Sequence, residues 1–119
     1  MPITLLDMND DEVEEYGPGE IVFTQGEAGG HMYLVLEGAV ELRVGGNLVA
    51  SAAEGDVMGE MALIEDQPRS AMAVAAGDVR LLPVDRERFE QLVRRNPGFA
   101  LTVLRTMARR LRQMNIAAG

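Results

Sequence analysis

Residues 40–47 read Val40-Glu41-Leu42-Arg43-Val44-Gly45-Gly46-Asn47. The apolar residues of this stretch alternate with Glu41 and Arg43, which is typical of a β-strand with one buried face and one face in water. Gly45, Gly46 and Asn47 then supply a turn. The stretch therefore predicts an antiparallel β protein.

Similar short apolar runs, separated by glycine, continue on both sides of this stretch. Eleven of the thirteen glycines fall at or before Gly77, at intervals of roughly 8 to 12 residues, a spacing typical of all-β domains. Several antiparallel strands with glycine turns predict a barrel or a jelly roll. The further strands are expected at Ile21–Gln25, Met32–Leu36, Leu48–Ala52, Ala71–Ala75 and Val79–Val84.

The apolar pattern changes to a helical period after Val84. Asp85 is placed to cap a helix that ends near Asn96, with Phe89, Leu92 and Val93 on one face. Asn96 and Pro97 then begin a second helix, expected to run to about Met114. Its heptad-like apolar seam could close over a ligand, pair with a second copy of the chain, or both. The seam consists of Ala100, Leu104, Met107, Leu111 and Met114.

Length and composition exclude most catalytic chemistry. The 119 residues fit a single domain, 1–119, with a β-roll over about 3–84 and C-terminal helices over about 85–114. The sequence has no Cys, no Lys and one His, so the usual metal spheres, thiol nucleophiles and Schiff bases are not available. Ser51 and Ser70 lack a nucleophile-elbow context. We expect no enzyme, metal or cofactor, and His31 is assigned no role.

Charge is distributed unevenly along the chain. The net charge is -8, and residues 1–58 carry one Arg against twelve carboxylates, whereas residues 86–119 carry eight Arg against Glu87 and Glu90. A basic helical end packed on an acidic body explains this better than a nucleic-acid surface, because the overall negative field repels polyanions. The first residues resemble no secretion signal, and the sequence contains no apolar run long enough for a membrane span. A cytoplasmic protein is expected.

One segment, Gly55–Ala71, departs from the strand-and-turn pattern. Gly59 lets the backbone approach a ligand closely, and Glu60–Ile64 are good helix formers, so a helical turn beginning there would present unpaired N–H groups to an anion. Arg69 offers a planar, permanently charged guanidinium to a phosphate. A carboxylate at Glu60 needs another partner on the same ligand, such as a ribose hydroxyl. The segment predicts a site for a phosphorylated ribose.

Plainer interpretations of the two charged residues exist beside this one. Arg69 could form a surface ion pair with Glu65 or Asp66. Glu60 could be a favourable negative charge in the first turn of a helix.

The same segment resembles the phosphate-binding cassette of the cyclic nucleotide-binding domain family. The match consists of Gly59-Glu60-Met61-Ala62-Leu63 followed by Pro68-Arg69-Ser70-Ala71. Glycines and apolar residues from Gly17 to Gly38, and Gly55-Asp56, also resemble the strand-and-turn pattern of that family. The similarity covers about Gly17 to Met114. It implies a jelly roll, or double-stranded β-helix, of about eight antiparallel strands with a short phosphate-binding helix and two C-terminal helices.

The resemblance also implies roles for individual residues. Arg69 would bind the cyclic phosphate, Glu60 the ribose 2′-hydroxyl, and Ser70 would lie against the phosphate or near the base. Backbone contacts are implied for Gly59, Met61, Ala62 and Ala71, and apolar walls for Val57 and Met58, with Leu42 and Val44 less firmly. From the last helix, the polar groups that could reach a purine are Thr102, Arg105, Thr106 and Arg109.

The resemblance implies a non-catalytic receptor for cAMP, with cGMP as an alternative base. Ligand contacts would reposition the C-terminal helices, with an apolar hinge around Phe89, Leu92 and Leu104, and relay the signal to a partner or effector in another chain. A homodimer through the last helix is a further possibility, and no nucleic acid or membrane partner is expected. The alternative function is a ligand-free interaction or dimerisation domain that uses the seam of the last helix.

Overall fold

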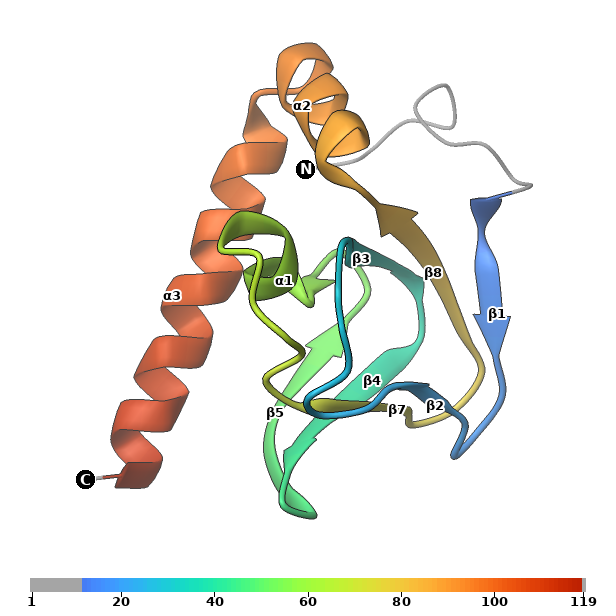
Figure 1. Ribbon diagram of the computed structural model, residues 1–119, viewed down its shortest axis with the longest axis vertical. Helices are drawn as coiled ribbons and strands as arrows, with labels where there is room; N and C mark the ends of the chain where they lie inside the picture. Colours follow the sequence, from blue (N-terminus) through green and yellow to red (C-terminus); the bar gives the residue numbers. More distant parts are fainter. Residues whose placement is uncertain (1–11, 119) are drawn as a thin grey trace.

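The computed structural model describes residues 12–118, including the side chains of residues 12–113. Eight strands are followed by two C-terminal helices, with a one-turn helix inserted before the last two strands (Figure 1). The strands are β1 (Glu14–Tyr16), β2 (Ile21–Phe23), β3 (Met32–Glu37), β4 (Ala39–Val44), β5 (Asn47–Ala53), β6 (Val57–Met58), β7 (Met72–Ala75) and β8 (Val79–Val84). The helices are α1 (Glu60–Ile64), α2 (Arg86–Arg95) and α3 (Gly98–Ala118).

The strands form two antiparallel sheets, which confirms the predicted jelly-roll class. One sheet has the order β1-β8-β3-β6 and the other the order β2-β7-β4-β5. The β4–β5 hairpin contains the expected turn, because Val44 pairs with Asn47 and both intervening glycines have positive φ. Two residues with positive φ between paired strands match the right-handed twist of a hairpin.

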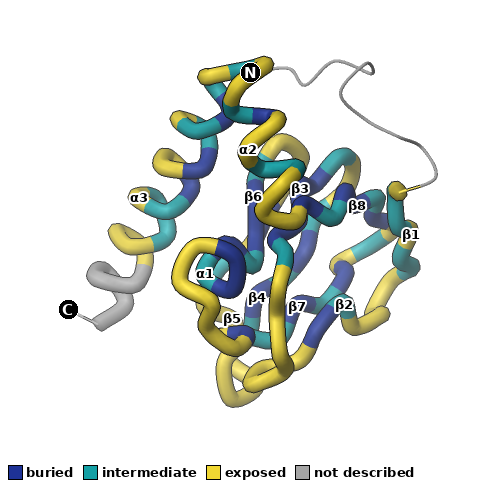
Figure 2. The backbone as a smooth tube through the Cα atoms, turned by 45° about the horizontal axis from the view of Figure 1, so that its top comes forward, coloured by how far each residue is buried: buried dark blue, intermediate teal, exposed yellow. Residues whose placement is uncertain are grey.

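The sheet that contains β3 and β8 is covered on both faces (Figure 2). Tyr33 and Leu81 face the second sheet, in a core cluster with Phe23, Val40 and Leu42. The other face packs on the helices through a second cluster, made up of Met32, Leu34, Val57, Leu63, Leu82, Val84, Leu92, Phe99 and Val103. Burial on both faces explains why β3 reads as a nearly continuous apolar run instead of alternating.

Some predicted boundaries differ from the structure. The strand expected over Ile21–Gln25 ends at Phe23, and the strand expected from Ala71 begins at Met72. Strands β1 and β6 were not expected at all. They have three and two residues, too few to show a period. Residues 3–11 of the expected roll lie outside the described residues.

The C-terminal helices begin where the capping residues predict. The Asp85 carboxylate accepts a hydrogen bond from the Arg88 N–H at 2.8 Å and caps α2. The Asn96 carbonyl accepts from the Phe99 N–H at 2.8 Å in the turn that opens α3. Helix α3 extends past the expected end near Met114, since neither Gly nor Pro occurs between Phe99 and Ala118. Among the described residues, no helix is both long and apolar enough to cross a membrane.

Candidate functional site

Gly59 shapes the backbone at the start of α1. Its φ of 74° lies in the left-handed region, where residues with a Cβ are strained. A Cβ built there would lie 2.4 Å from Nη1 of Arg69. The Gly59 carbonyl oxygen accepts a hydrogen bond from the same Nη1 at 3.3 Å. Glycine is therefore required both by the turn and by the guanidinium beside it.

Arg69 is buried, with 5% of its surface exposed. The β2–β3 loop holds its backbone, because the Arg69 N–H donates to the Glu27 carbonyl at 2.9 Å and its own carbonyl accepts from the Gly26 N–H at 2.8 Å. Burial lowers the pKa of the guanidinium below its ordinary value. Within residues 12–113 no carboxylate forms an ion pair with it, and its Nε is buried without a hydrogen-bond partner. The surface ion pair with Glu65 or Asp66 is therefore wrong.

Glu60 is the first residue of α1 and is 6% exposed. Its two carboxylate oxygens lie 3.0 and 3.2 Å from Nη1 of Arg110, on α3. Arg110 Nη2 donates to the carbonyl of Val57. Glu60 thus places a negative charge in the first turn of α1, and it also forms a buried ion pair with Arg110 that joins α1 to α3.

Glu60 and Arg69 open into a common cavity of about 510 Å³ between the sheet of β4 and β5, helix α1 and helix α3. Its wall is mostly apolar, with polar groups from α1, from α3 and from the loop before β7. The lining residues are Phe23, Leu42, Val44, Val49, Ala50, Gly59, Glu60, Met61, Ala62, Arg69, Ser70, Ala71, Met107, Ala108, Arg110 and Leu111. Such a cavity suits a ligand with one anionic and one hydroxylated end.

The structure brings most of the predicted site residues to this cavity, including Leu42 and Val44. Val57 and Met58 do not line it. Both are fully buried, Val57 on the helix side of its sheet and Met58 between the two sheets. Their role as walls would be indirect, through the backbone of β6 and the Val57 carbonyl.

Sequence reasoning missed Arg110 and named four other polar residues of the last helix. None of these four lines the cavity. Thr102 donates to the Gly98 carbonyl at 3.2 Å, Thr106 is buried and Arg105 is exposed. Arg109 pairs with Asp56 at 3.0 Å. A signal for Arg110 did exist, because residues 97–118 contain no carboxylate that could partner the Arg109-Arg110 pair within the helix.

The apolar seam expected on α3 lies next to the face of the helix that packs into the core, and is not that face itself. Phe99 and Val103 point into the helix-side core, whereas Met107 and Leu111 line the cavity. Leu104 is 60% exposed, so it does not pack at the expected hinge. Helices α2 and α3 meet instead through Phe89 and Phe99, whose ring centroids lie 5.8 Å apart.

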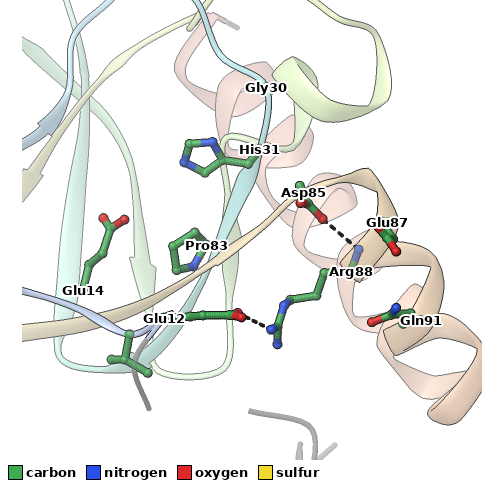
Figure 3. A pocket seen from close by; sticks show the side chains of 10 residues that line it. Glu12, Glu14, Gly30, His31, Pro83, Asp85, Glu87, Arg88 and Gln91 are labelled. Carbon is green, nitrogen blue, oxygen red and sulfur yellow. Dashed lines mark hydrogen bonds and ion pairs between the residues drawn. The ribbon is translucent and has the colours of Figure 1, made fainter. Parts of the chain in front are cut away.

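A second cavity, of about 690 Å³, lies between β1, the end of β8 and α2 (Figure 3). The imidazole of His31 points into it, with the carboxylates of Glu14 and Asp85 on other walls. The His31 ring also contacts the ring of Tyr33, with their centroids 4.9 Å apart. Desolvation, and next the charge of Arg69, lower the pKa of His31 below its ordinary value. Over the described residues no group of three or more His, Cys, Asp or Glu could hold a metal ion.

Comparisons with known proteins find a matching family and several similar chains. The family description "Cyclic nucleotide-binding domain" matches residues 13–96. The cyclic AMP receptor protein of Thermus thermophilus is 39% identical over 106 residues, which are 85% of this chain and 49% of that protein. The cAMP-dependent protein kinase regulatory subunit of Debaryomyces hansenii is 38% identical over 82 residues, 67% of this chain and 18% of that protein.

A solved structure has the same fold. The crystal structure of the Thermus thermophilus catabolite activator protein aligns with a TM-score of 0.72 and 37% identity, over 89% of this chain and 52% of that one. The chain spans about half, or less, of the length of these three proteins.

Proposed function

The chain belongs to the cyclic nucleotide-binding domain family, and from this we propose that it is a non-catalytic receptor for a cyclic purine nucleotide, cAMP in the first place. The Arg69 guanidinium would bind the cyclic phosphate and the Glu60 carboxylate the ribose 2′-hydroxyl. Backbone groups of Gly59, Met61, Ala62 and Ala71, and the Ser70 hydroxyl, would complete the contacts.

The observation that carries this proposal is a buried cation that has no carboxylate partner among the described residues. Burying an unpaired charge is unfavourable, yet Arg69 sits in the wall of a cavity with one hydrogen bond from its side chain, at 3.3 Å. A phosphate in the cavity would neutralise this charge in a site with little water, where charge-assisted hydrogen bonds are strong. Glu60, on the same wall, repels a bare phosphate and so favours an anion that also carries hydroxyl groups.

The names of two relatives favour cAMP over cGMP. These relatives are described as a cyclic AMP receptor protein and a cAMP-dependent kinase regulatory subunit. Ser70 is exposed at the cavity rim, and its hydroxyl could serve either purine. Competition between the two nucleotides decides this point.

The signal would pass through α3. Arg109 and Arg110 tie this helix to the body of the roll at Asp56 and Glu60. A ribose that binds Glu60 competes for the carboxylate that Arg110 occupies, so nucleotide binding would shift the population of α3 positions. The output would lie in a partner or effector in another chain. That the chain binds no nucleic acid, and that it acts in the cytoplasm, stay predictions from its sequence.

A second candidate function is an interaction domain that works through α3 without a ligand. Leu101, Leu104 and Leu111 are 47%, 60% and 60% exposed, an apolar stripe that a partner or a second copy could cover. This function predicts an assembly whose stability is independent of added nucleotide.

Titration calorimetry of the chain with cAMP, with cGMP competition, tests the proposal. Saturable binding at one site per chain is expected, with the nucleotide recovered unchanged after prolonged incubation. Absence of binding to either nucleotide, together with a nucleotide-independent dimer in ultracentrifugation, would favour the second candidate. Recovery of the hydrolysed nucleotide would contradict the non-catalytic assignment.

A further inference from the structure

The guanidinium of Arg69 lies over two aromatic rings. Its Cζ lies 4.3 Å from the centroid of the Phe23 ring and 5.8 Å from that of Tyr33. The two rings stack on each other, with centroids 6.1 Å apart and planes inclined by 19°. Each ring residue is 5% exposed. The guanidinium therefore lies on a rigid aromatic surface inside the roll.

The two rings come from different strands, and both pack in the core between the sheets. Phe23 ends β2 and Tyr33 lies in β3, and both belong to the core cluster between the sheets. A Cβ at Gly29 would lie 3.4 Å from Cζ and Nε of Arg69 and 2.2 Å from the Cβ of Ala62. Glycine at this position is therefore required by the close approach of Ala62, and the guanidinium lies just beyond, at van der Waals distance.

We propose that Phe23 and Tyr33 are positioning residues that hold the Arg69 guanidinium by cation–π contact, in place of a carboxylate. The faces of aromatic rings attract a cation, most strongly where water is excluded. Unlike a carboxylate, a ring does not neutralise the cation or occupy its in-plane N–H groups. The unliganded site thus keeps an oriented and uncompensated positive charge for an incoming anion. This inference rests on the proposed function as far as the anion is a cyclic nucleotide.

Fluorination of Phe23 tests the contact with little change in shape. Replacing Phe23 by mono-, di- and trifluorophenylalanine withdraws electron density from the ring face in steps. Because a desolvated cation–π contact contributes about 0.5 to 2 kcal/mol, its loss lets the unliganded guanidinium leave the orientation that binds phosphate. Binding must then restore this orientation, so the trifluoro ring should raise the Kd for cAMP roughly two- to thirtyfold, with intermediate steps between. The matched control is the same series at Phe99, which is also buried and packs on Phe89. The Kd should not change across that series.

A second measurement needs no nucleotide. Trifluorination of Phe23 should lower the thermal unfolding midpoint of the unliganded chain with Arg69 in place, and should lower it less in the Arg69→Met background. Equal losses in both backgrounds, or a Kd that stays constant across the Phe23 series, would overturn the proposal. If the wild-type chain binds no cyclic nucleotide, the proposed function fails, and the unfolding cycle alone decides whether the rings hold Arg69.

Discussion

Arg110 Nη1 lies 3.0 and 3.2 Å from the two carboxylate oxygens of Glu60, although 50 residues separate them in the sequence. Their side chains are 11% and 9% exposed. The ion pair fastens α3 to the first turn of α1, at the carboxylate expected to bind ribose. Helix position and ligand site are therefore physically connected through one pair of residues.

Arg110→Met should destabilise the unliganded chain. Removing one partner leaves Glu60 buried without compensation, and breaking a buried ion pair in this way costs about 3 to 5 kcal/mol. Urea unfolding measures the loss. Arg112→Met, at an exposed position of the same helix, is the matched control and should change stability little. Adding Glu60→Gln to Arg110→Met should recover part of the loss, and a strictly additive double variant would contradict the coupling.

Arg69→Leu should separate binding from stability. The loss of the phosphate partner should weaken cAMP binding by at least about tenfold, because removing one member of a desolvated charge pair costs about 2 to 5 kcal/mol. Unfolding of the unliganded chain should change by only about 1 kcal/mol, since the desolvation of the guanidinium opposes its attraction to the rings. Calorimetry and urea unfolding measure the two quantities. Unchanged affinity in this variant would remove Arg69 from the site.

The sequence was sufficient for those parts of the site that depend on local spacing. Gly59, Glu60 and Arg69 lie within eleven consecutive residues, and the glycine, the helix formers and the arginine each indicate their local role. Their convergence on one cavity could be predicted from the resemblance. The glycine-rich hairpin and the Asp85 cap could be predicted equally well, because turns and caps depend on the residues immediately beside them.

The contacts between distant elements could not be predicted in the same way. Arg110 reaches Glu60 because α3 forms one wall of the cavity, and a helical period does not determine which polar residue points there. Leu104 was expected at the hinge, yet the helix is rotated so that Val103 is buried and Leu104 is exposed. Val57 and Met58 were expected at the cavity. Strand β6 pairs with β3 instead, and both side chains are buried in the core.

Gly59→Ala should reduce both stability and affinity. The left-handed conformation of this residue costs about 1 to 2 kcal/mol once a Cβ is present, and the Cβ also collides with Arg69 Nη1. Gly19→Ala is the matched control, since Gly19 has a similar φ of 81° and open space around a built Cβ. Both variants should lose similar backbone stability in urea, and Gly59→Ala should in addition bind cAMP more weakly. Equal affinities in the two variants would contradict the close approach of the Gly59 backbone to the guanidinium.

His31 should make stability depend on pH. Desolvation, and then the charge of Arg69, lower its pKa below 6.5, against a smaller opposite effect of Glu14 and Asp85. The unfolded chain then binds more protons than the folded chain as the pH falls through 6.5, so the folded state loses stability over that range. His31→Gln removes this group and should lose less stability over the same range. Urea unfolding at several pH values measures the difference, and parallel pH curves for the two proteins would contradict it.

The same histidine should also make nucleotide binding depend on pH. A bound phosphate offsets the charge of Arg69 and so removes one cause that lowers the His31 pKa. Nucleotide binding should then take up protons at pH values below the ordinary histidine pKa, and cAMP affinity should rise as the pH falls through that region. Calorimetry in buffers of different ionisation enthalpy measures the proton uptake directly. Because His31→Gln keeps every group that contacts the nucleotide, uptake of the same size in that variant would assign the proton to another residue.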